Sequence, residues 1–450
     1  MRTPAPAAPG AAEALRTLLD GLEVGPLGEE IQATIAELYP LCRSITGDGL
    51  RASLKVLQRT APLTLHEVPT GTPVLDWVVP REWNLRRARL WAPDGAVLAD
   101  TDVSNLHVLN YSVPFAGSVS LDELQPHLHS LPEAPELIPY RTSYYKDAWG
   151  FCLPHAVRQQ LRPGPYRVEI DTTLQDGALS YGELLVPGLQ QAEVLVSTHC
   201  CHPSLANDNC AGMAMCAVLA RMLRGVQLRY SYRFLFVPGT IGAITWLARN
   251  GSTAQRIAHG LVAACVGDRG RLTYKRSRRG TAEVDRAAVH VLQHAGADYE
   301  VRDFTPYGYD ERQYCSPGFN LAVGSLTRTP YGEYPEYHTS ADNLSLVRPA
   351  SVVDTLRRYL EVFEVLEGNR TYQNLSPRGE PQLGKRGLYG ALGGQSHAQA
   401  RQMAMLWVLN QSDGTASLLD IAERAKLPFP QIRWAAGALE AAGLLAEVSA

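Results

Sequence analysis

Residues 193–212 read EVLVSTHCCHPSLANDNCAG, and this stretch decides the fold class. Its apolar start predicts a buried strand over 193–196, and the apolar run 213–223 predicts a helix. The loop between them carries imidazole and carboxylate groups at a strand end, where open α/β sheets bind their ligands. His202 and Asp208 are close enough in sequence to reach one ion, and their side chains are typical ligands of catalytic zinc. A polar loop with a satisfied histidine is the alternative.

A second histidine and acid cluster, YPEYHTSADN at 334–343, follows far downstream. It comes after the apolar run 319–326, which predicts another strand, while the apolar run that starts at Leu261 ends in Asp268. Uninterrupted apolar strands indicate a sheet that is covered on both faces. Three strand ends thus offer metal ligands, although an aspartate in this place can also cap a helix. The predicted ligands are His202, Asp208, Asp268 and His338.

Six short motifs are spread over the chain. They are CHPS at 201–204, NDN at 207–209, VPGTIG at 237–242, YKRSR at 274–278, DERQYCSP at 310–317 and EYHT at 336–339. In this combination the chain resembles the zinc-dependent aminopeptidase superfamily. It resembles more closely a bacterial aminopeptidase-like branch that carries an inserted β domain and a winged-helix tail. That branch often occurs among polysaccharide or natural-product biosynthesis proteins, and the resemblance covers nearly the whole chain.

The resemblance implies an α/β fold with a mainly parallel mixed sheet sandwiched by helices, a small β-rich insert and a C-terminal winged helix. The sequence agrees, because strand-like pieces in the insert are short and the turn PDG at 93–95 predicts a hairpin. The Pro- and Gly-rich residues 370–388 predict a linker. The predicted domains are a catalytic domain of residues 1–67 and 164–375, an insert of residues 68–163, and a winged helix-turn-helix of residues 385–450.

The chain departs from the superfamily after the predicted strand 234–237. The superfamily places two adjacent glutamates there, one as general base and one as ligand of a second zinc, whereas this chain reads PGTIG at 238–242. The departure favours a single zinc ion, with two ions as the alternative. Another carboxylate must then accept the proton of the attacking water. Glu311 and Glu336 are the predicted bases, and an ordinary structural acid is the alternative for each.

Two further residues are predicted to contact the substrate from the loops around the metal. His199 directly follows the strand, where the superfamily has its first zinc histidine, but the branch motif points to His202. We therefore predict His202 as the ligand and His199 as a residue that orients a ligand or binds substrate. Arg43, in the Gly-rich loop 43–49, is predicted to meet a substrate carboxylate. A plain turn between helices is the alternative for this loop.

Aromatic residues supply the remaining predicted substrate contacts. The segment 140–152 is dense in aromatic side chains, which indicates either a cleft wall or a seam between domains. We predict substrate contacts from Tyr144 and Tyr145, and from Tyr337 beside the predicted metal ligand. The basic segment 274–279 would favour an anionic substrate if it lined the cleft, although such runs are usually solvated.

Composition limits the protein class. The 450 residues are 45% hydrophobic and 19% charged with a net charge of −3, so the chain is expected to be globular without a nucleic-acid footprint. Eight cysteines without finger or disulfide spacing indicate a reducing compartment, and we expect a cytoplasmic protein with neither signal peptide nor membrane span. The predicted recognition helix offers only Arg433 as a cation. Packing or dimerisation is therefore favoured over DNA binding, and a homo-oligomer is expected.

The resemblance and the candidate site together predict a zinc-dependent, aminopeptidase-like amide hydrolase. Its substrate is expected to be a small peptide, aminoacyl or acylamino intermediate of natural-product or polysaccharide biosynthesis. A mononuclear zinc acyl-transfer or cyclisation enzyme is the first alternative. A non-enzymatic metal-binding or DNA-binding regulatory protein is the second. Metal content separates the second alternative from the enzymes, and product analysis separates hydrolysis from transfer.

Overall fold

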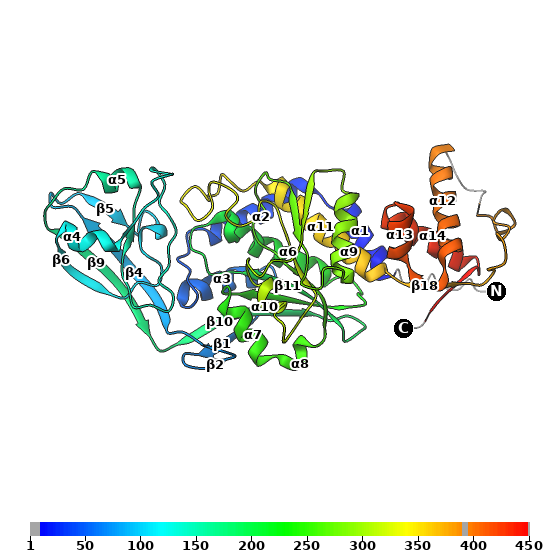
Figure 1. Ribbon diagram of the computed structural model, residues 1–450, viewed down its shortest axis with the longest axis horizontal. Helices are drawn as coiled ribbons and strands as arrows, with labels where there is room; N and C mark the ends of the chain where they lie inside the picture. Colours follow the sequence, from blue (N-terminus) through cyan, green and yellow to red (C-terminus); the bar gives the residue numbers. More distant parts are fainter. Residues whose placement is uncertain (1–9, 389–394, 449–450) are drawn as a thin grey trace.

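Three bodies follow one another along the long axis of the protein (Figure 1). The structure, a computed structural model, describes residues 10–388 and 395–448. The β-rich insert lies at one end, the α/β body in the middle and the winged helix at the other end (Figure 1). In these described ranges no helix is both long and apolar enough to cross a membrane. The N-terminal Pro/Ala tail, from which we predicted the absence of a signal peptide, lies outside them.

The central body is built on one eight-stranded mixed sheet. Its order is β1 (Thr64–Pro69), β10 (Ala178–Val186), β12 (Ser231–Val237), β11 (Glu193–His199), β13 (Ile257–Val262), β16 (Val323–Thr327), β14 (Leu272–Lys275) and β15 (Tyr299–Arg302). The four strands from β12 to β16 run parallel, and antiparallel pairs flank them. Every residue of β11 and β12 is buried, as the uninterrupted apolar runs predict. The predicted fold class is confirmed.

Alternate side chains of β11 enter two separate cores. Val194 and Val196 pack with the helices of one face, whereas Leu195 packs with those of the other. Successive side chains of a strand point to opposite faces, so a single strand holds both layers to the sheet. The first layer contains α1 (Ala11–Asp20), α2 (Val24–Leu38), α3 (Asp48–Gln58), α6 (Ala211–Leu223), α9 (Glu283–Gln293) and α11 (Pro349–Gly368). The second contains α7 (Ile241–Arg249), α8 (Gly251–Ala254) and α10 (Glu311–Tyr314).

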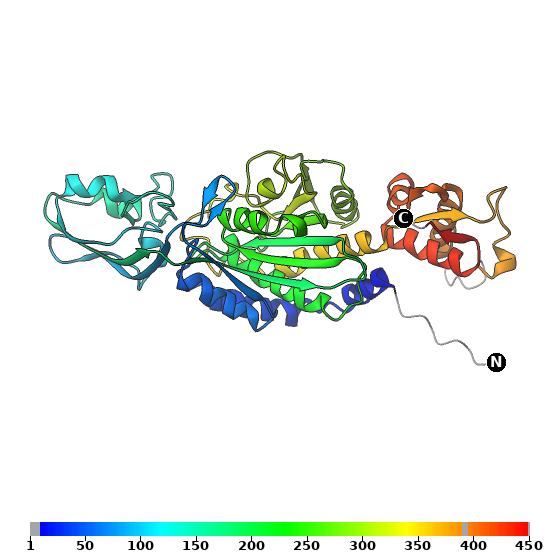
Figure 2. The same cartoon turned by 90° about the horizontal axis from the view of Figure 1, so that it is seen from below.

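The insert is a four-stranded antiparallel sheet between strands β1 and β10 of the body. Its order is β5 (Val97–Asp100), β4 (Glu82–Trp91), β9 (Tyr166–Gln175) and β6 (Phe115–Val119). Strands β4 and β5 form the hairpin predicted at 93–95, with Gly95 at a φ of 89°. Strand β9 lies beyond residue 163, where we expected the insert to end, because it pairs with β4 and β6. The paired strands β4 and β9 connect the insert to the body (Figure 2).

The C-terminal body contains α12 (Gln395–Gln411), α13 (Leu418–Ala425), α14 (Phe429–Ala441) and a three-stranded sheet. The sheet order is β18 (Asp413–Ser417), β17 (Thr371–Asn374) and β19 (Leu445–Glu447). Strand β17 directly follows α11, so this body begins near residue 370 instead of 385, the boundary expected from the linker. The Ser417 hydroxyl accepts from the Asp420 amide at 3.2 Å, which confirms the helix cap typical of this position.

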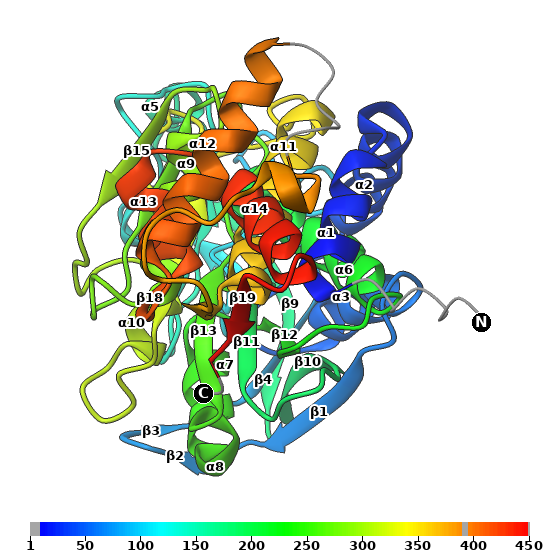
Figure 3. The same cartoon turned by 90° about the vertical axis from the view of Figure 1, so that its right-hand side faces the viewer.

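The winged helix docks against α9 and α11 of the central body. In the end-on view it faces the viewer, in front of the central body (Figure 3). Arg286 of α9 forms ion pairs with Asp420 and Glu423 of α13, both at 2.6 Å. The Phe429 amide at the start of α14 donates to His290 Nε2 at 3.0 Å. The docked surface therefore combines charge pairs with a buried backbone hydrogen bond.

The placement of β17 generates a test by truncation. A chain that ends after Asn369 is expected to stay monodisperse, since the whole winged helix is removed. A chain that ends after Gly384 keeps β17 without its two partner strands and exposes Tyr372, which is buried in the full chain. We expect that chain to aggregate, because an unpaired strand edge is a template for association. Light scattering after gel filtration, with the full chain as control, distinguishes the two; equal behaviour of both truncations would contradict this boundary.

Candidate metal centre

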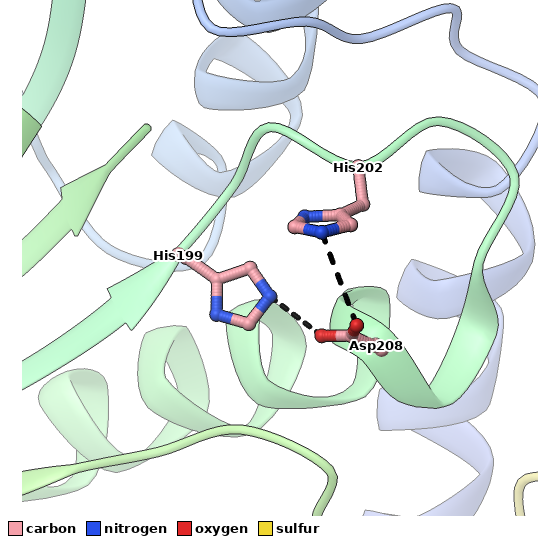
Figure 4. A group of neighbouring side chains, drawn as sticks. All are labelled: His199, His202 and Asp208. Atoms are coloured by element: carbon pink, nitrogen blue, oxygen red, sulfur yellow. Dashed lines mark hydrogen bonds and ion pairs between the residues drawn. The ribbon is translucent and has the colours of Figure 1, made fainter. Parts of the chain in front are cut away.

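Three imidazoles converge on the carboxylate of Asp208. Figure 4 draws two of them, those of His199 and His202. His199 is the last residue of β11, His202 lies on the following loop, and Asp208 sits just before α6. His199 Nε2 lies 2.6 Å from Asp208 Oδ1. His338 Nε2 lies 3.1 Å and His202 Nε2 3.9 Å from Asp208 Oδ2. Residues far apart in sequence thus meet beyond the carboxyl end of β11.

The chemistry of this donor set fits a zinc ion. Ligand atoms of His199, His202 and Asp208 all lie within 4.8 Å of one another. Burial lowers the pKa of His202 well below its usual range, which leaves its ring neutral with a free lone pair. Burial raises the pKa of Asp208, but the surrounding histidines outweigh this and hold it well below the usual range. Neutral imidazole nitrogens around a carboxylate form a site of the kind that binds catalytic zinc.

Both histidines that the sequence offered as first ligand belong to this cluster. His199 was expected to orient a ligand or bind substrate, and His202 to bind the metal. The structure brings both rings to Asp208, with ring centroids 4.9 Å apart, and His199 is the closer of the two. The strand-end position of His199 and the CHPS motif around His202 therefore each pointed to a histidine of the cluster.

Asp268, the remaining predicted ligand, is engaged elsewhere. Its oxygens accept hydrogen bonds from the Gly270 amide at 2.5 Å, the Thr329 hydroxyl at 2.7 Å and the Asn207 amide group at 3.1 Å. Among the described residues no hydrogen bond or ion pair joins Asp268 to the three histidines. Its contact with Asn207 places it as a support for the loop that carries Asp208.

A further acid, Asp342, holds the backbone of the same loop. It accepts from the Asn207 amide at 2.6 Å, the Asp208 amide at 3.0 Å and the Tyr334 hydroxyl at 3.2 Å. Burial raises the pKa of Asp342 to about 7. The sequence analysis did not single out this residue. Its place a few residues after His338, in the same motif segment, was the available signal.

Arg43 lies inside the protein and not on a cleft surface. Its side chain is fully buried and donates to the carbonyl of His202 at 2.9 Å, to Cys210 Sγ at 3.0 Å and to the carbonyl of Leu38. This burial argues against the substrate contact expected for Arg43, because its donors face protein groups. The guanidinium instead ties the His202 loop to the end of α2.

Tyrosines cover the imidazole cluster from two sides. The Tyr309 ring lies 3.9 Å from the His199 ring, and its hydroxyl is 3.4 Å from His202 Nδ1. Tyr140, from the insert, has its ring centroid 5.0 Å from those of both His202 and His338. The predicted Tyr337 stacks on His338 at 3.9 Å. Neither Tyr140 nor Tyr309 was predicted from the sequence. Tyr140 is the first residue of the aromatic segment 140–152, and Tyr309 directly precedes the motif at 310–317.

Tyr309 also explains why a carboxylate is missing after β12. A Cβ atom at Gly239 would lie 2.0 Å from Tyr309 Cε1, which is far inside van der Waals contact. The tyrosine ring therefore occupies the space that any side chain at this position would need. A glutamate at position 239 and the Tyr309 ring in its present place therefore exclude each other.

The two predicted bases differ in their surroundings. Glu311 is fully buried and forms an ion pair with Lys275 at 2.6 Å, while its oxygens also accept from the Tyr309 amide at 3.2 and 3.1 Å. Glu336 is half buried, and in the described part of the chain its carboxylate has no hydrogen bond or ion pair. Glu311 thus positions the Tyr309 loop, whereas Glu336 keeps a free carboxylate two residues from His338.

A cavity of about 230 Å³ opens beside Tyr309. Both Tyr144 and Tyr145, which were predicted to contact substrate, line it. The Tyr144 hydroxyl is hydrogen bonded to that of Tyr140 at 3.0 Å, so the cavity and the imidazole cluster share one aromatic wall. The other lining residues are Ile45, Trp77, Gly239, Thr240, Ile241, Ile244, Gly308 and Arg312.

Comparison with known protein families identifies the family of this chain. Residues 32–369 match a family model described as "Domain of unknown function (DUF4910)", which covers the body and the insert. The chain belongs to the DUF4910 family. Residues 370–447 match a winged helix-turn-helix model, and its start agrees with the place of β17 in the C-terminal sheet. The predicted winged helix is confirmed.

Individual relatives agree with this DUF4910 assignment. A Clostridium acetobutylicum protein, named for polysaccharide biosynthesis and an aminopeptidase-like domain, is 49% identical over 93% of this chain and 96% of its own. A crystal structure from the same organism, described as a peptidase, has a TM-score of 0.92 and 46% identity over 97% of this chain and 100% of that chain. A Bacillus subtilis zinc aminopeptidase shares the fold, with a TM-score of 0.55 and 12% identity over 76% of this chain and 95% of that chain. The predicted resemblance to bacterial zinc aminopeptidases is confirmed.

The contact between Tyr309 and Gly239 can be tested by adding one methyl group. Gly239→Ala is expected to lower the free energy of unfolding by about 1–3 kcal/mol, because an overpacked side chain forces its neighbours to shift. Gly251→Ala is the matched control, since a Cβ atom there meets nothing within 4 Å. In a Tyr309→Ala background the additional cost of Gly239→Ala should approach zero. Denaturant titration of the four variants measures this; equal costs with and without the Tyr309 ring would contradict the contact.

Proposed function

We propose that this protein is a zinc-dependent amide hydrolase that removes an aminoacyl or acylamino group from a small peptide, sugar or biosynthetic intermediate. The observation that carries the proposal is the convergence of three imidazoles on Asp208 at the strand ends of an aminopeptidase-like sheet. The two Clostridium acetobutylicum relatives support it, since one is described as a peptidase and the other is named for polysaccharide biosynthesis.

Four side chains would hold the zinc ion. Nitrogen atoms of His199, His202 and His338 and an oxygen of Asp208 provide a donor set of the right chemistry. When bound, zinc polarises an amide carbonyl and lowers the pKa of a bound water to about 7. Every other task in the reaction falls to residues of this chain.

Two tyrosines are placed to donate hydrogen bonds to the developing oxyanion. Burial raises the pKa of both Tyr309 and Tyr140 well above the usual range, so each keeps its proton. The Tyr309 hydroxyl lies within 3.5 Å of both ring nitrogens of His202, and the Tyr140 ring packs against His202 and His338. Donors in a buried site stabilise an oxyanion more strongly than donors in water do.

A free carboxylate must accept the water proton and return it to the leaving amine. We assign this role to Glu336, because its carboxylate is unengaged whereas Glu311 is held by Lys275 and the Tyr309 amide. The sequence left both acids open. Glu311 then acts as a positioning residue that fixes Tyr309 beside the imidazole cluster.

The mononuclear acyl-transfer or cyclisation enzyme stays as a second candidate function. It is favoured by the Tyr309 ring, which fills the space needed by a carboxylate for a second metal. Both candidates use one ion, so metal content does not separate them. Incorporation of ¹⁸O from labelled water into the carboxylate product supports hydrolysis, and a product without the label indicates transfer or cyclisation.

For the winged helix we propose a packing role and no nucleic-acid partner. Arg433, the expected cation of the recognition helix, is half buried, while Trp434 beside it is 39% exposed. This arrangement supports packing over nucleic-acid binding by α14. The homo-oligomer expected from the sequence remains a prediction.

Metal content tests the proposal directly. Protein purified without chelator is expected to carry about one zinc per chain, and saturating zinc should stabilise it by about 4 kcal/mol at a thousand times the Kd. His199→Ala and His338→Ala should each lose the metal, whereas His294→Ala, a change at an exposed histidine that ends α9, should keep it. Elemental analysis and thermal unfolding measure both effects. Absence of any transition metal, together with no stabilisation by added zinc, would sink the proposal.

Replacement of Glu336 or Glu311 by glutamine identifies the general base. Glu336→Gln should keep fold and zinc but lower turnover by about 10²–10⁴-fold, the usual contribution of a general base. Glu311→Gln should act mainly through stability, since it weakens the ion pair with Lys275 and the support of Tyr309. Steady-state kinetics with zinc content and unfolding temperature as controls separate the two. A larger loss of turnover in fully folded Glu311→Gln would move the role to Glu311.

A further inference from the structure

The cavity beside Tyr309 combines an apolar wall with a single cation. Trp77 and Tyr145 of the insert face each other across 5.2 Å between ring centroids, and the isoleucines of the lining add hydrocarbon surface. Arg312 is the one charged residue among the lining residues that the structure describes. The cavity has a volume of about 230 Å³, which is small for a complete ligand and suits one substituent of a larger substrate.

The Arg312 guanidinium has no partner within the protein. The side chain is half buried, its Nε is inaccessible to solvent and unbonded, and the described residues offer it neither a hydrogen bond nor an ion pair. Two other half-buried arginines are paired, Arg51 with Glu82 and Arg286 with Asp420. Withdrawing a charged donor from water without a partner costs free energy. A cation left open toward a cavity is therefore typical of a binding site for an anion.

Asp310 does not form an ion pair with Arg312 in the described structure. Asp310 precedes Arg312 by two residues and is fully buried, but neither of its carboxylate oxygens makes a hydrogen bond in the described structure. Burial raises the pKa of Asp310 well above its usual range, which disfavours its charged form. The positive charge of Arg312 thus faces the cavity uncompensated. The basic segment 274–279, considered from the sequence, contributes no lining residue.

We infer that the cavity is a specificity subsite for a carboxylate-bearing substituent, with Arg312 binding the carboxylate and the aromatic wall binding its apolar stem. The inference rests on the proposed function, because the subsite shares Tyr309 and Tyr144 with the imidazole cluster. Guanidinium and carboxylate form two parallel hydrogen bonds, which a carboxamide of the same shape cannot match. The substrate class is accordingly an acidic aminoacyl or acyl group.

The catalytic arm of the test compares two isosteric substrates with the zinc-loaded full chain. The kcat/KM for α-glutamyl-p-nitroanilide is expected to exceed that for glutaminyl-p-nitroanilide by about 10–100-fold, the range of a charged hydrogen bond. Arg312→Met should bring the ratio near one and leave the glutaminyl value within about threefold, and Arg312→Lys should retain part of the preference. Arg278→Gln, an exposed arginine bonded to Asn320, is the matched control and should change nothing.

A binding arm works without turnover. Calorimetric titration of the zinc-loaded protein should detect phenylacetate but only weaker binding of phenylacetamide, and Arg312→Met should abolish the difference. Phenylacetate that binds Arg312→Met as well as wild type would be held by the metal, which would overturn the subsite. Hydrolysis of both anilides without preference, together with equal binding of both probes, would overturn the subsite and leave the hydrolase. Preferential binding of phenylacetate through Arg312 without hydrolysis of either anilide would uphold the subsite and overturn the proposed reaction.

Discussion

A buried carboxylate surrounded by imidazoles is the constraint on which the rest of the site depends. Asp208 has no cationic Lys or Arg partner in the described structure, so its charge is balanced by groups that can share a metal ion with it. Asp342 and Asp268 fix the loop through backbone and amide contacts, and Arg43 fixes the neighbouring loop through the His202 carbonyl. Polar residues without direct contact with an ion thus maintain the geometry that an ion requires.

Much of the architecture followed from local patterns. Uninterrupted apolar runs marked the central strands, and the loops after them predicted a shared site for His202, Asp208, Asp268 and His338, of which Asp268 lies outside the imidazole cluster. The sequence did not predict the directions in which individual side chains point. Arg43 was expected to meet a substrate carboxylate, yet its side chain is buried against protein groups, and the Tyr309 ring reaches the cluster through the space that Gly239 leaves. Such outcomes depend on residues that are distant in sequence.

The boundaries of the bodies illustrate the same limit. Strand β9 belongs to the insert and β17 to the winged helix, although β10 of the body follows β9 and α11 of the body precedes β17 directly along the chain. Composition changes near residues 163 and 385, whereas the structural boundaries are set by pairing with remote strands. A strand alone does not reveal its partner, since the register is decided by residues on both sides.

The paired strands β4 and β9 give the insert a particular relation to the catalytic body. They carry a sheet whose loops supply Tyr140 and Tyr144 to the site, while His199, His202 and Asp208 belong to the body. The two walls of the cavity are therefore encoded in separate stretches of the chain, Trp77, Tyr144 and Tyr145 in the insert and Tyr309 and Arg312 in the body. Substitutions in the insert can thus reshape the aromatic wall while Arg312 and the imidazole cluster stay unchanged.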